Sequence, residues 1–195
     1  MTKIMVLNGS FRPHGFTDSL IRSFKAGAES RGHEVTVFPL RAMDIHPCVG
    51  CLHGGRDTAR PCTQSDDMDR IYDTYRESDV IVFATPLFFW TYSGLLKNAM
   101  DRLWALAEGR DDQLHGNGKS GALLVAVGGS HPQPILDHFD YLMKRLEWIN
   151  LGKVVLTHTD DMDMDHIPTN QQAFQLGAGV AVSYTHLTLP TTSRV

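Results

Sequence analysis

The sequence predicts a doubly wound α/β domain, in which helices cover both faces of a parallel β-sheet. Buried, strand-like runs alternate with helical patterns five times along the 195 residues. The central runs are apolar on both faces, as a sheet between two layers of helices requires. The chain length also suits one domain. Sheets of this kind bind ligands beyond the carboxyl ends of their strands, where the strand order reverses, so we expect the functional site there.

Five segments carry a strand pattern, either as near-continuous apolar runs or as alternation. They lie at residues 3–9, 33–40, 80–84, 121–129 and 153–158. Apolar residues at helical spacing predict helices between and after these runs. The helical segments are 20–28, 68–75, 96–106, 135–146 and 168–182. Gly32 suits the end of the first helix, and residues 41–65 have no period, which predicts a long loop.

Composition limits the class of protein. The chain is 42% hydrophobic and 21% charged, which is sufficient for a folded core, and its net charge of −4 argues against nucleic acid as the main partner. No apolar run approaches the ~18 residues of a membrane span, and the N-terminus lacks a secretion signal. The three cysteines fit reduced thiols, so we expect a cytoplasmic protein. We expect one domain over residues 1–182, and an atypical tail, 183–195, that is disordered or foreign to the domain.

The segment "LNGSFRPHGFTDSL", residues 7–20, follows the first strand and has the composition of an anion cradle. Free N–H groups and the helix dipole favour an anion where a helix begins. Ser10 and Thr17 add hydroxyl groups, and Arg12 adds a cation for charge-assisted hydrogen bonds. The segment matches neither the P-loop nor the dinucleotide glycine motif. The alternative is an ordinary turn and helix with Thr17 as the cap.

Two further segments follow the third and fourth strands. Pro86 ends the third strand and precedes a run of bulky apolar residues: Leu87, Phe88, Phe89 and Trp90. This run suits a flat ring ligand, or it packs into the core or a subunit interface. Gly128 and Gly129 remove side chains where the edge of a planar ligand would lie, or they form a simple turn. Because the three strands are expected to be neighbours, a phosphate joined to a flat ring system fits all three segments, as in FMN.

The ordered set of motifs resembles the NAD(P)H-dependent FMN reductase family, and in particular its branch related to iron–sulfur flavoproteins. The matching pieces are "NGSFRPHGFT" (8–17), "CVGCLHGG" (48–55) with Cys62, "DDMDRIY" (66–72), "SDVIVFATPLFF" (78–89), "SGLLKNAMDR" (93–102) and "VGG" (127–129). The resemblance implies a flavodoxin-like three-layer sandwich with a five-stranded parallel sheet, one FMN per subunit, and a homodimer or higher homo-oligomer.

The resemblance also implies which residues bind the cofactor. Those around the phosphate are Ser10, Arg12, Phe16, Thr17 and Asp18. Those along the isoalloxazine ring are Pro86, Leu87, Phe88 and Phe89, with Gly128 at its far edge. Lys97, Asp101 and Arg102 match the helix that follows the flavin loop, where helix solubility and subunit pairing are alternatives to ligand contact.

The cysteines depart from the iron–sulfur pattern. Cys48, Cys51 and Cys62 are present, but Gly54 stands where the third of four cysteines would fall. A cubane cluster normally needs four thiolates, so we predict no cluster and no metal. Zinc held with the help of His53 and a redox pair of cysteines are alternatives to a plain cysteine-bearing loop. The acidic segment 159–166 is interpreted as a solvated loop rather than a metal site, because it lacks the pattern of a calcium loop.

The predicted activity is hydride transfer from NAD(P)H through bound FMN to a small acceptor such as a quinone, an azo compound or free flavin. No catalytic side chain is expected, because the flavin carries the chemistry. The alternatives are a flavodoxin-type electron carrier and a non-enzymatic FMN-binding regulatory protein. The modest charge and the aromatic residues Trp90 and Tyr92 favour the enzyme. The physiological acceptor and the choice between NADH and NADPH stay open.

Overall fold

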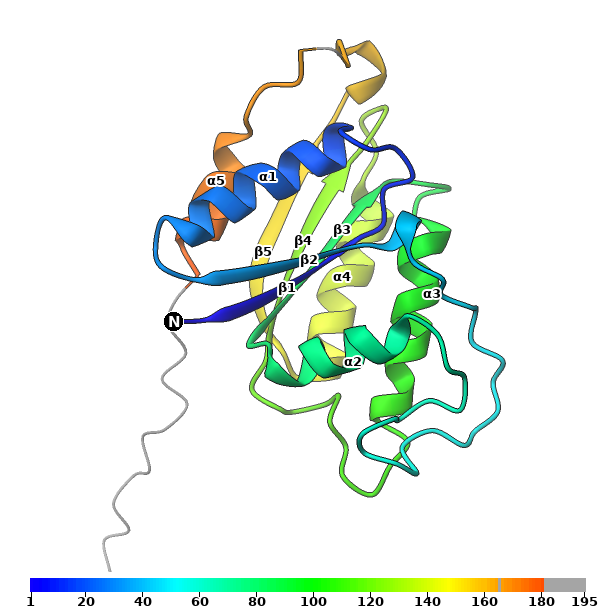
Figure 1. Cartoon of the computed structure of the whole chain (residues 1–195). Helices are drawn as coiled ribbons and strands as arrows, with labels where there is room; N and C mark the ends of the chain where they lie inside the picture. Colours follow the sequence, from blue (N-terminus) through cyan, green and yellow to red (C-terminus); the bar gives the residue numbers. More distant parts are fainter. Residues whose placement is uncertain (165, 181–195) are drawn as a thin grey trace, which may run out of the picture.

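A computed structural model of the chain describes residues 1–164 and 166–180, and it contains a five-stranded parallel sheet with the order β2-β1-β3-β4-β5 (Figure 1). The strands are β1 (Lys3–Asn8), β2 (Glu34–Pro39), β3 (Val80–Pro86), β4 (Ser120–Ala126) and β5 (Ile149–Leu156). The helices are α1 (Phe16–Glu29), α2 (Met68–Glu77), α3 (Gly94–Leu103), α4 (Gln133–Leu146) and α5 (Gln171–Ala178). This strand order is that of the flavodoxin-like fold, so the predicted fold class is confirmed.

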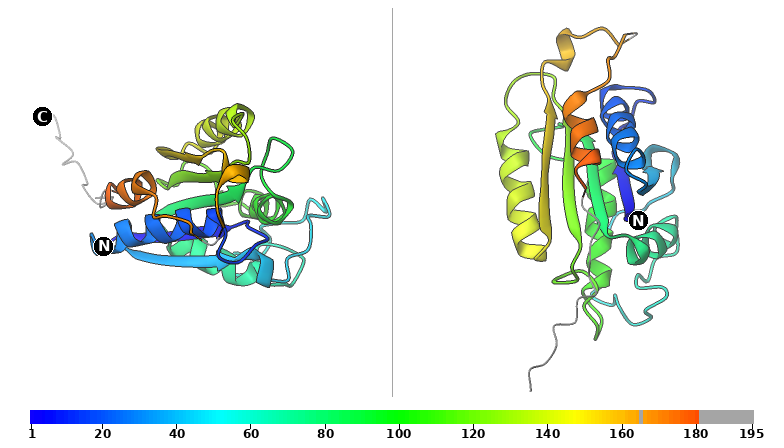
Figure 2. Two further views of the ribbon diagram at one scale, coloured as in Figure 1. Left: turned by 90° about the horizontal axis from the view of Figure 1, so that it is seen from above. Right: turned by 90° about the vertical axis from the view of Figure 1, so that its left-hand side faces the viewer.

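Side chains that alternate along the strands build a core on each face of the sheet. Ile4 and Val6 of β1 face α1, whereas Met5 and Leu7 face the opposite layer. Helices α1 and α5 cover the first face and α2, α3 and α4 cover the second, as the views from above and from the side show (Figure 2). The central strands β1, β3 and β4 are buried on both faces, which explains their continuous apolar runs.

Two strand boundaries differ from the prediction by three residues or more. Strand β5 begins at Ile149 rather than at residue 153, because this edge strand starts with exposed residues that carry no apolar run. Strand β4 ends at Ala126, and the apolar pattern that continued to residue 129 belongs to the following loop. Helix α5 occupies the centre of the predicted segment 168–182, and the predicted tail at 183–195 lies outside the described residues. Within the described residues, no helix has both the length and the apolar character to cross a membrane.

Helices α1 and α5 approach closely at a reciprocal pair of glycines. A Cβ atom on Gly177 would meet the backbone oxygen of Phe24, and one on Gly27 would meet the backbone oxygen of Phe174. Two side-chain hydrogen bonds fasten the segment before α5 to α1: Ser19 Oγ donates to Pro168 O at 3.0 Å, and Asn170 N donates to Ser23 Oγ at 3.0 Å. Helix α5 therefore fixes the position of α1, whose first turn lies at the functional edge of the sheet.

We expect Gly177→Ala to destabilise the fold by about 1–3 kcal/mol, the usual cost of overpacking, because a backbone atom cannot move aside as a side chain does. Urea unfolding measures the change. Gly94→Ala is the control, since nothing lies within 4 Å of its added Cβ atom. If the two variants were equally stable, helices α1 and α5 could move apart without a loss of stability, and the close contact would not be required.

Candidate functional site

A cavity of about 260 Å³ lies beyond the carboxyl ends of β1, β3 and β4, where the strand order reverses. We call it the first cavity. Eight of the ten predicted site residues line it: Ser10, Arg12, Phe16, Thr17, Pro86, Leu87, Phe88 and Gly128. Six residues that the sequence did not predict complete the wall: Phe11, Gly15, Ala126, Thr159, Asp160 and Met164.

A second cavity of about 390 Å³ adjoins the first, with which it shares Leu87, Gly128 and Asp160. Its other wall residues are Phe89, Trp90, Val127, Gly129, Ser130 and His131. The predicted residue Phe89 therefore lies here rather than in the first cavity. The two volumes together fall within the range of about 300–1,000 Å³ that is typical of small-molecule sites.

Asp18, the tenth predicted residue, lines neither cavity because its carboxylate braces the loop between β1 and α1. Asn8 Nδ2 donates to Asp18 Oδ1 at 2.6 Å, and the backbone N–H of His14 donates to Asp18 Oδ2 at 2.7 Å. The guanidinium of Arg41 lies 3.5 Å from the same carboxylate. Asn8 Oδ1 also accepts the N–H of Ser10 at 3.0 Å. The carboxylate is thus engaged by residues that line neither cavity.

The first turn of α1 offers open backbone donors to the first cavity. Gly15 is the N-cap and no side chain caps the helix, so the alternative that made Thr17 the cap is wrong. The first N–H groups of a helix have no partner within it, and the earliest helical bond here is that of Ser19 N to Gly15 O at 3.0 Å. These N–H groups and the dipole of α1 favour an anion at this end of the cavity.

Arg12 and Ser10 add side-chain groups to the same end of the cavity. Arg12 is exposed and forms no ion pair within the described part of the chain, so its charge is available to a ligand. The hydroxyl of Ser10 donates to Arg12 O at 2.9 Å and accepts the N–H of Arg12 at 3.3 Å, which fixes the backbone that carries the guanidinium. A cation beside open N–H groups is chemically suited to a phosphate.

Ser93 joins the loop after β1 to the loop after β3. Its hydroxyl donates to Gly9 O at 2.7 Å and accepts the N–H of Leu96 at 3.3 Å as the N-cap of α3. The N–H of Ser93 donates to Thr85 Oγ1 at 3.0 Å. Gly9 must be a glycine, because a Cβ atom there would lie 2.6 Å from the Ser93 hydroxyl. The two loops therefore hold a fixed spacing across the first cavity.

Aromatic residues form the wall contributed by the loop after β3. Phe11 and Phe88 stack across the gap between the two loops, with ring centroids 5.8 Å apart. Phe88 then opens a tight turn, in which its N–H and C=O pair with Thr91 at 3.1 and 3.0 Å. The apolar run of the sequence thus borders the cavities, as predicted, while Tyr92 is buried below it.

The loop after β5 closes the site from the other side, which the sequence analysis missed. His158 N donates to Gly129 O and Thr159 N to Val127 O, both at 3.0 Å. These bonds place the carboxylate of Asp160 against Gly128, where any Cβ atom would collide with it. The acidic segment was interpreted as a solvated loop, yet Thr159, Asp160 and Met164 line the first cavity. Its position after a strand end was the signal that could have revealed this role.

Arg102 anchors the long loop that carries the cysteines. Its side chain, on the last turn of α3, is 1% exposed and binds the fully buried Asp66 through two hydrogen bonds of 2.7 and 3.1 Å. It also donates to His46 O at 2.9 Å and to Cys62 Sγ at 3.2 Å. The alternative roles that the sequence analysis gave Arg102, in helix solubility or in subunit pairing, are therefore wrong. The same two roles remain open for the exposed pair Lys97–Asp101. Burial raises the pKa of Asp66, but the stronger combined effect of the hydrogen bonds from Arg102 and from two backbone N–H groups leaves this pKa below its ordinary value.

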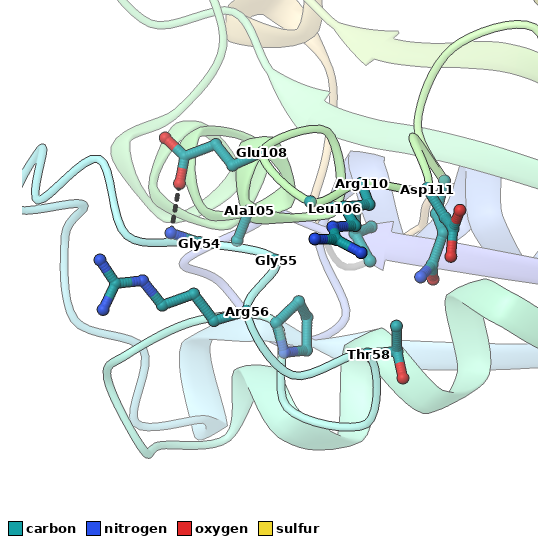
Figure 3. A pocket seen from close by; sticks show the side chains of 12 residues that line it. Gly54, Gly55, Arg56, Thr58, Ala105, Leu106, Glu108, Arg110 and Asp111 are labelled. Atoms are coloured by element: carbon teal, nitrogen blue, oxygen red, sulfur yellow. Dashed lines mark hydrogen bonds between the residues drawn. The ribbon is translucent and has the colours of Figure 1, made fainter.

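The cysteine loop does not fit a four-thiolate cluster. Gly54, at the position of the missing cysteine, packs against the 3₁₀ turn Trp104–Leu106 and donates its N–H to Glu108 at 2.5 Å (Figure 3). A Cβ atom at residue 54 would collide with the Glu108 carboxylate and with Ala105. Over residues 1–164 and 166–180, no group of three or more His, Cys, Asp or Glu side chains has the geometry of a metal site. We therefore derive no chemistry through a cluster.

The thiols are free and differ in their surroundings. Cys51 is partly exposed, and hydrogen bonds from the Thr63 hydroxyl and the His53 N–H lower its pKa. Cys62 faces the Arg102 guanidinium. A cavity of about 410 Å³ opens beside Gly54 and Gly55 (Figure 3). It shares no residue with the first or the second cavity.

The five-stranded parallel sheet and its strand order define a flavodoxin-like protein, and the two adjoining cavities lie at the edge where sheets of this kind bind ligands. Over residues 2–161 the chain matches the family described as NADPH-dependent FMN reductase, and it belongs to this family. The family resemblance, the class of enzyme and the use of FMN with NAD(P)H, all predicted from the sequence, are confirmed by this membership.

Known proteins of this kind are similar over most of the chain. An iron–sulfur flavoprotein of Archaeoglobus fulgidus is 25% identical over 188 residues, which cover 93% of this chain and 80% of that protein. An FMN-dependent NADH:quinone oxidoreductase of Shewanella sp. (strain W3-18-1) is 27% identical over 179 residues, covering 84% and 89%. The crystal structure of RosB with a bound 8-demethyl-8-formylriboflavin-5′-phosphate shares the fold, with a TM-score of 0.68 at 17% identity over 91% of this chain and 77% of that one.

We expect Asp66→Asn to destabilise the fold by about 3–5 kcal/mol at neutral pH, because it leaves the buried Arg102 cation without its counter-charge. The pKa of Asp66 is lowered in the folded state. The contribution of Asp66 to the free energy of unfolding is therefore complete above the ordinary carboxyl pKa of about 3.9. It is lost as the pH falls through the lower pKa that Asp66 has in the folded state. Urea unfolding at neutral and acidic pH tests both statements.

The control for this pair is Asp101→Asn, next to Arg102 but 44% exposed in its side chain and paired with Lys97 on the surface. We expect a change of less than about 1 kcal/mol. An Asp66→Asn protein as stable as this control would refute the anchoring role of the pair. A stability that still falls as steeply in acid as that of the wild type would refute the assignment of the pH dependence to Asp66.

Proposed function

We propose that this enzyme passes a hydride from NAD(P)H through FMN, held in the first cavity and along the residues that it shares with the second, to a small planar acceptor such as a quinone or an azo compound. One observation carries the proposal. Arg12, which has no ion pair in the described part of the chain, and the uncapped first turn of α1 lie in the same cavity as the apolar residues of the loop after β3. A molecule that carries a phosphate and a flat ring suits both parts of this site, the phosphate at the cation and helix and the ring at the apolar residues. When bound, FMN supplies the ring that accepts and releases the hydride.

In this proposal the residues of the first cavity hold the phosphate end of FMN. Arg12 supplies charge-assisted hydrogen bonds, and Thr17 and the first N–H groups of α1 supply further donors. The hydroxyl of Ser10 already donates to Arg12 O, so Ser10 acts by holding the backbone of Arg12. Phe16 belongs to the same wall. Asp18 does not touch the phosphate but orients the loop through Asn8 and His14.

The residues shared by the two cavities suit the ring. Pro86, Leu87 and Phe88 present apolar surface, and Gly128 leaves room beside them. Asp160 brings a carboxylate that can accept a hydrogen bond from a ring N–H. Phe89 extends this wall into the second cavity. The protein's task is then to position the cofactor and to leave one side of it open to the reactants.

The choice of acceptor rests on the exposed aromatic residues at the rim and on the quinone-reducing relative. Phe89 and Trp90 give an apolar surface where an electron carrier of the flavodoxin type would present acidic groups to a protein partner. The family description names NADPH and the Shewanella relative names NADH, so we propose that one of these is the hydride donor. The homodimer and the cytoplasmic location stay predictions.

Anaerobic mixing of the FMN-loaded protein with NADH or NADPH tests the function. We expect one nucleotide to bleach the visible flavin band within seconds, and a quinone added afterwards to restore it. A flavin that stays oxidised with both nucleotides would contradict the hydride-transfer role. A flavin that is reduced but reoxidised only by a protein carrier would favour the flavodoxin-type alternative.

We expect Arg12→Ala to weaken FMN binding by about 10- to 100-fold, the value of a charge-assisted hydrogen bond of about 1.5–3 kcal/mol, while the fold stays intact. Titration that follows the quenching of flavin fluorescence measures the affinity, and circular dichroism checks the fold. Arg22→Ala is the matched control, because Arg22 is an exposed arginine of α1 outside both cavities. Unchanged affinity in Arg12→Ala would contradict the phosphate site.

A further inference from the structure

The turn that leads from β3 to α3, residues 88–91, places two large aromatic side chains in an unfavourable backbone conformation. Phe88 and Thr91 form both hydrogen bonds of the turn, which leaves Phe89 and Trp90 as its central residues. Their φ angles are +49° and +60°. Positive φ at both central positions is the mark of a type I′ turn, for which Asn-Gly is the preferred pair. Bulky side chains rarely adopt this conformation, because their Cβ atoms crowd the backbone.

Burial does not explain the two residues. Phe89 is 90% exposed and Trp90 is 57% exposed, so neither side chain contributes much to the core. Their rings contact each other edge to face, with centroids 5.4 Å apart. The turn itself is held in place from below, since Ser93 N donates to Thr85 Oγ1 at 3.0 Å and that hydroxyl donates to Pro86 O at 2.8 Å. Strain of this kind persists where the surroundings impose it, and it is concentrated at functional sites.

The two rings lie beside an open cavity rather than on a bare surface. Both line the second cavity, and Ser130 and His131 of the loop after β4 form another part of its wall. The cavity adjoins the proposed FMN site through Leu87, Gly128 and Asp160. Of the described residues that line it, none is a lysine or an arginine, so it offers no fixed cation to the phosphates of a dinucleotide. An uncharged planar molecule is the ligand that two exposed aromatic rings recognise well.

We propose that Trp90, supported by the ring of Phe89, is the residue that binds the planar acceptor and sets its size and shape, an inference that rests on the proposed function. The strained turn then has a function, because it places the indole where the acceptor binds. An Asn-Gly turn would be less strained but would place no aromatic ring there. The acceptor class is a flat, uncharged aromatic or quinonoid compound. Trp90 acts on acceptor binding and leaves the binding of FMN to the residues of the first cavity.

The variant Trp90→Gly separates the effect of Trp90 on stability from its effect on acceptor binding, because glycine is the residue that this position of the turn prefers. We expect the melting temperature to rise by about 2–4 °C as the strain is relieved. We expect KM for a planar quinone to rise about tenfold, the loss of one aromatic stacking contact. The anaerobic reduction of bound FMN by the preferred nucleotide should keep its wild-type rate, and Trp90→Phe should restore most of the quinone affinity.

Trp104→Ala is the matched control, since Trp104 is a surface tryptophan with 52% exposure that lines neither cavity of the site. It should leave KM for the quinone unchanged. If wild-type FMN is reduced but Trp90→Gly keeps the wild-type KM, the inference is wrong and the proposed function stands. If no nucleotide reduces the wild-type flavin, both fail. A variant that changes its sedimentation instead of its KM would assign Trp90 to a contact between copies of the chain and overturn the inference.

Discussion

The hydroxyl of Ser93 is the interaction on which the geometry of the site depends. It is completely buried, donates to Gly9 and accepts from the first turn of α3, so one oxygen joins the loops after β1 and β3. These loops are neighbours only because the chain returns to the centre of the sheet after β2. The proposed phosphate site on one loop and the apolar wall on the other can hold one ligand only at a fixed spacing. The hydroxyl provides this spacing, and the absence of a side chain at Gly9 permits it.

The charges of the site follow from the way Asp18 is engaged. A carboxylate in the first turn of α1 would compete with an anionic ligand for the helix dipole and for Arg12. Its two oxygens instead accept hydrogen bonds from Asn8 and His14, and Arg41 lies beside it as a counter-charge. The same bonds shape the loop so that Arg12 stays free. An acidic residue thus helps to build the proposed anion site without lining it.

Local patterns in the sequence predict the elements and most of the site, because strand and helix periods are local and the carboxyl-end rule needs only strand order. Eight of the ten predicted residues line the first cavity; seven of them also stand out from their position after a strand end, whereas Phe16 was named only through the family resemblance. The misses have long-range causes. Asp160 reaches the site because its loop folds back to residues 127–129, and Arg102 is buried because it pairs with Asp66, 36 positions away. No periodicity encodes such pairings, and the turn around Trp90 depends likewise on hydrogen bonds from Thr85 and Ser93.

Helix α3 connects the site to the cysteine loop, since Ser93 caps its first turn and the anchor residue Arg102 lies in its last turn. The loop therefore takes its position from a buried ion pair and from the close packing of Gly54. Three thiols and a closed fourth position do not complete a cluster. In the proposed reaction the reduced ring then has to pass its electrons to an acceptor that reaches it from solvent. This requirement gives a physical reason for the second cavity to be open and for a strained aromatic turn to border it.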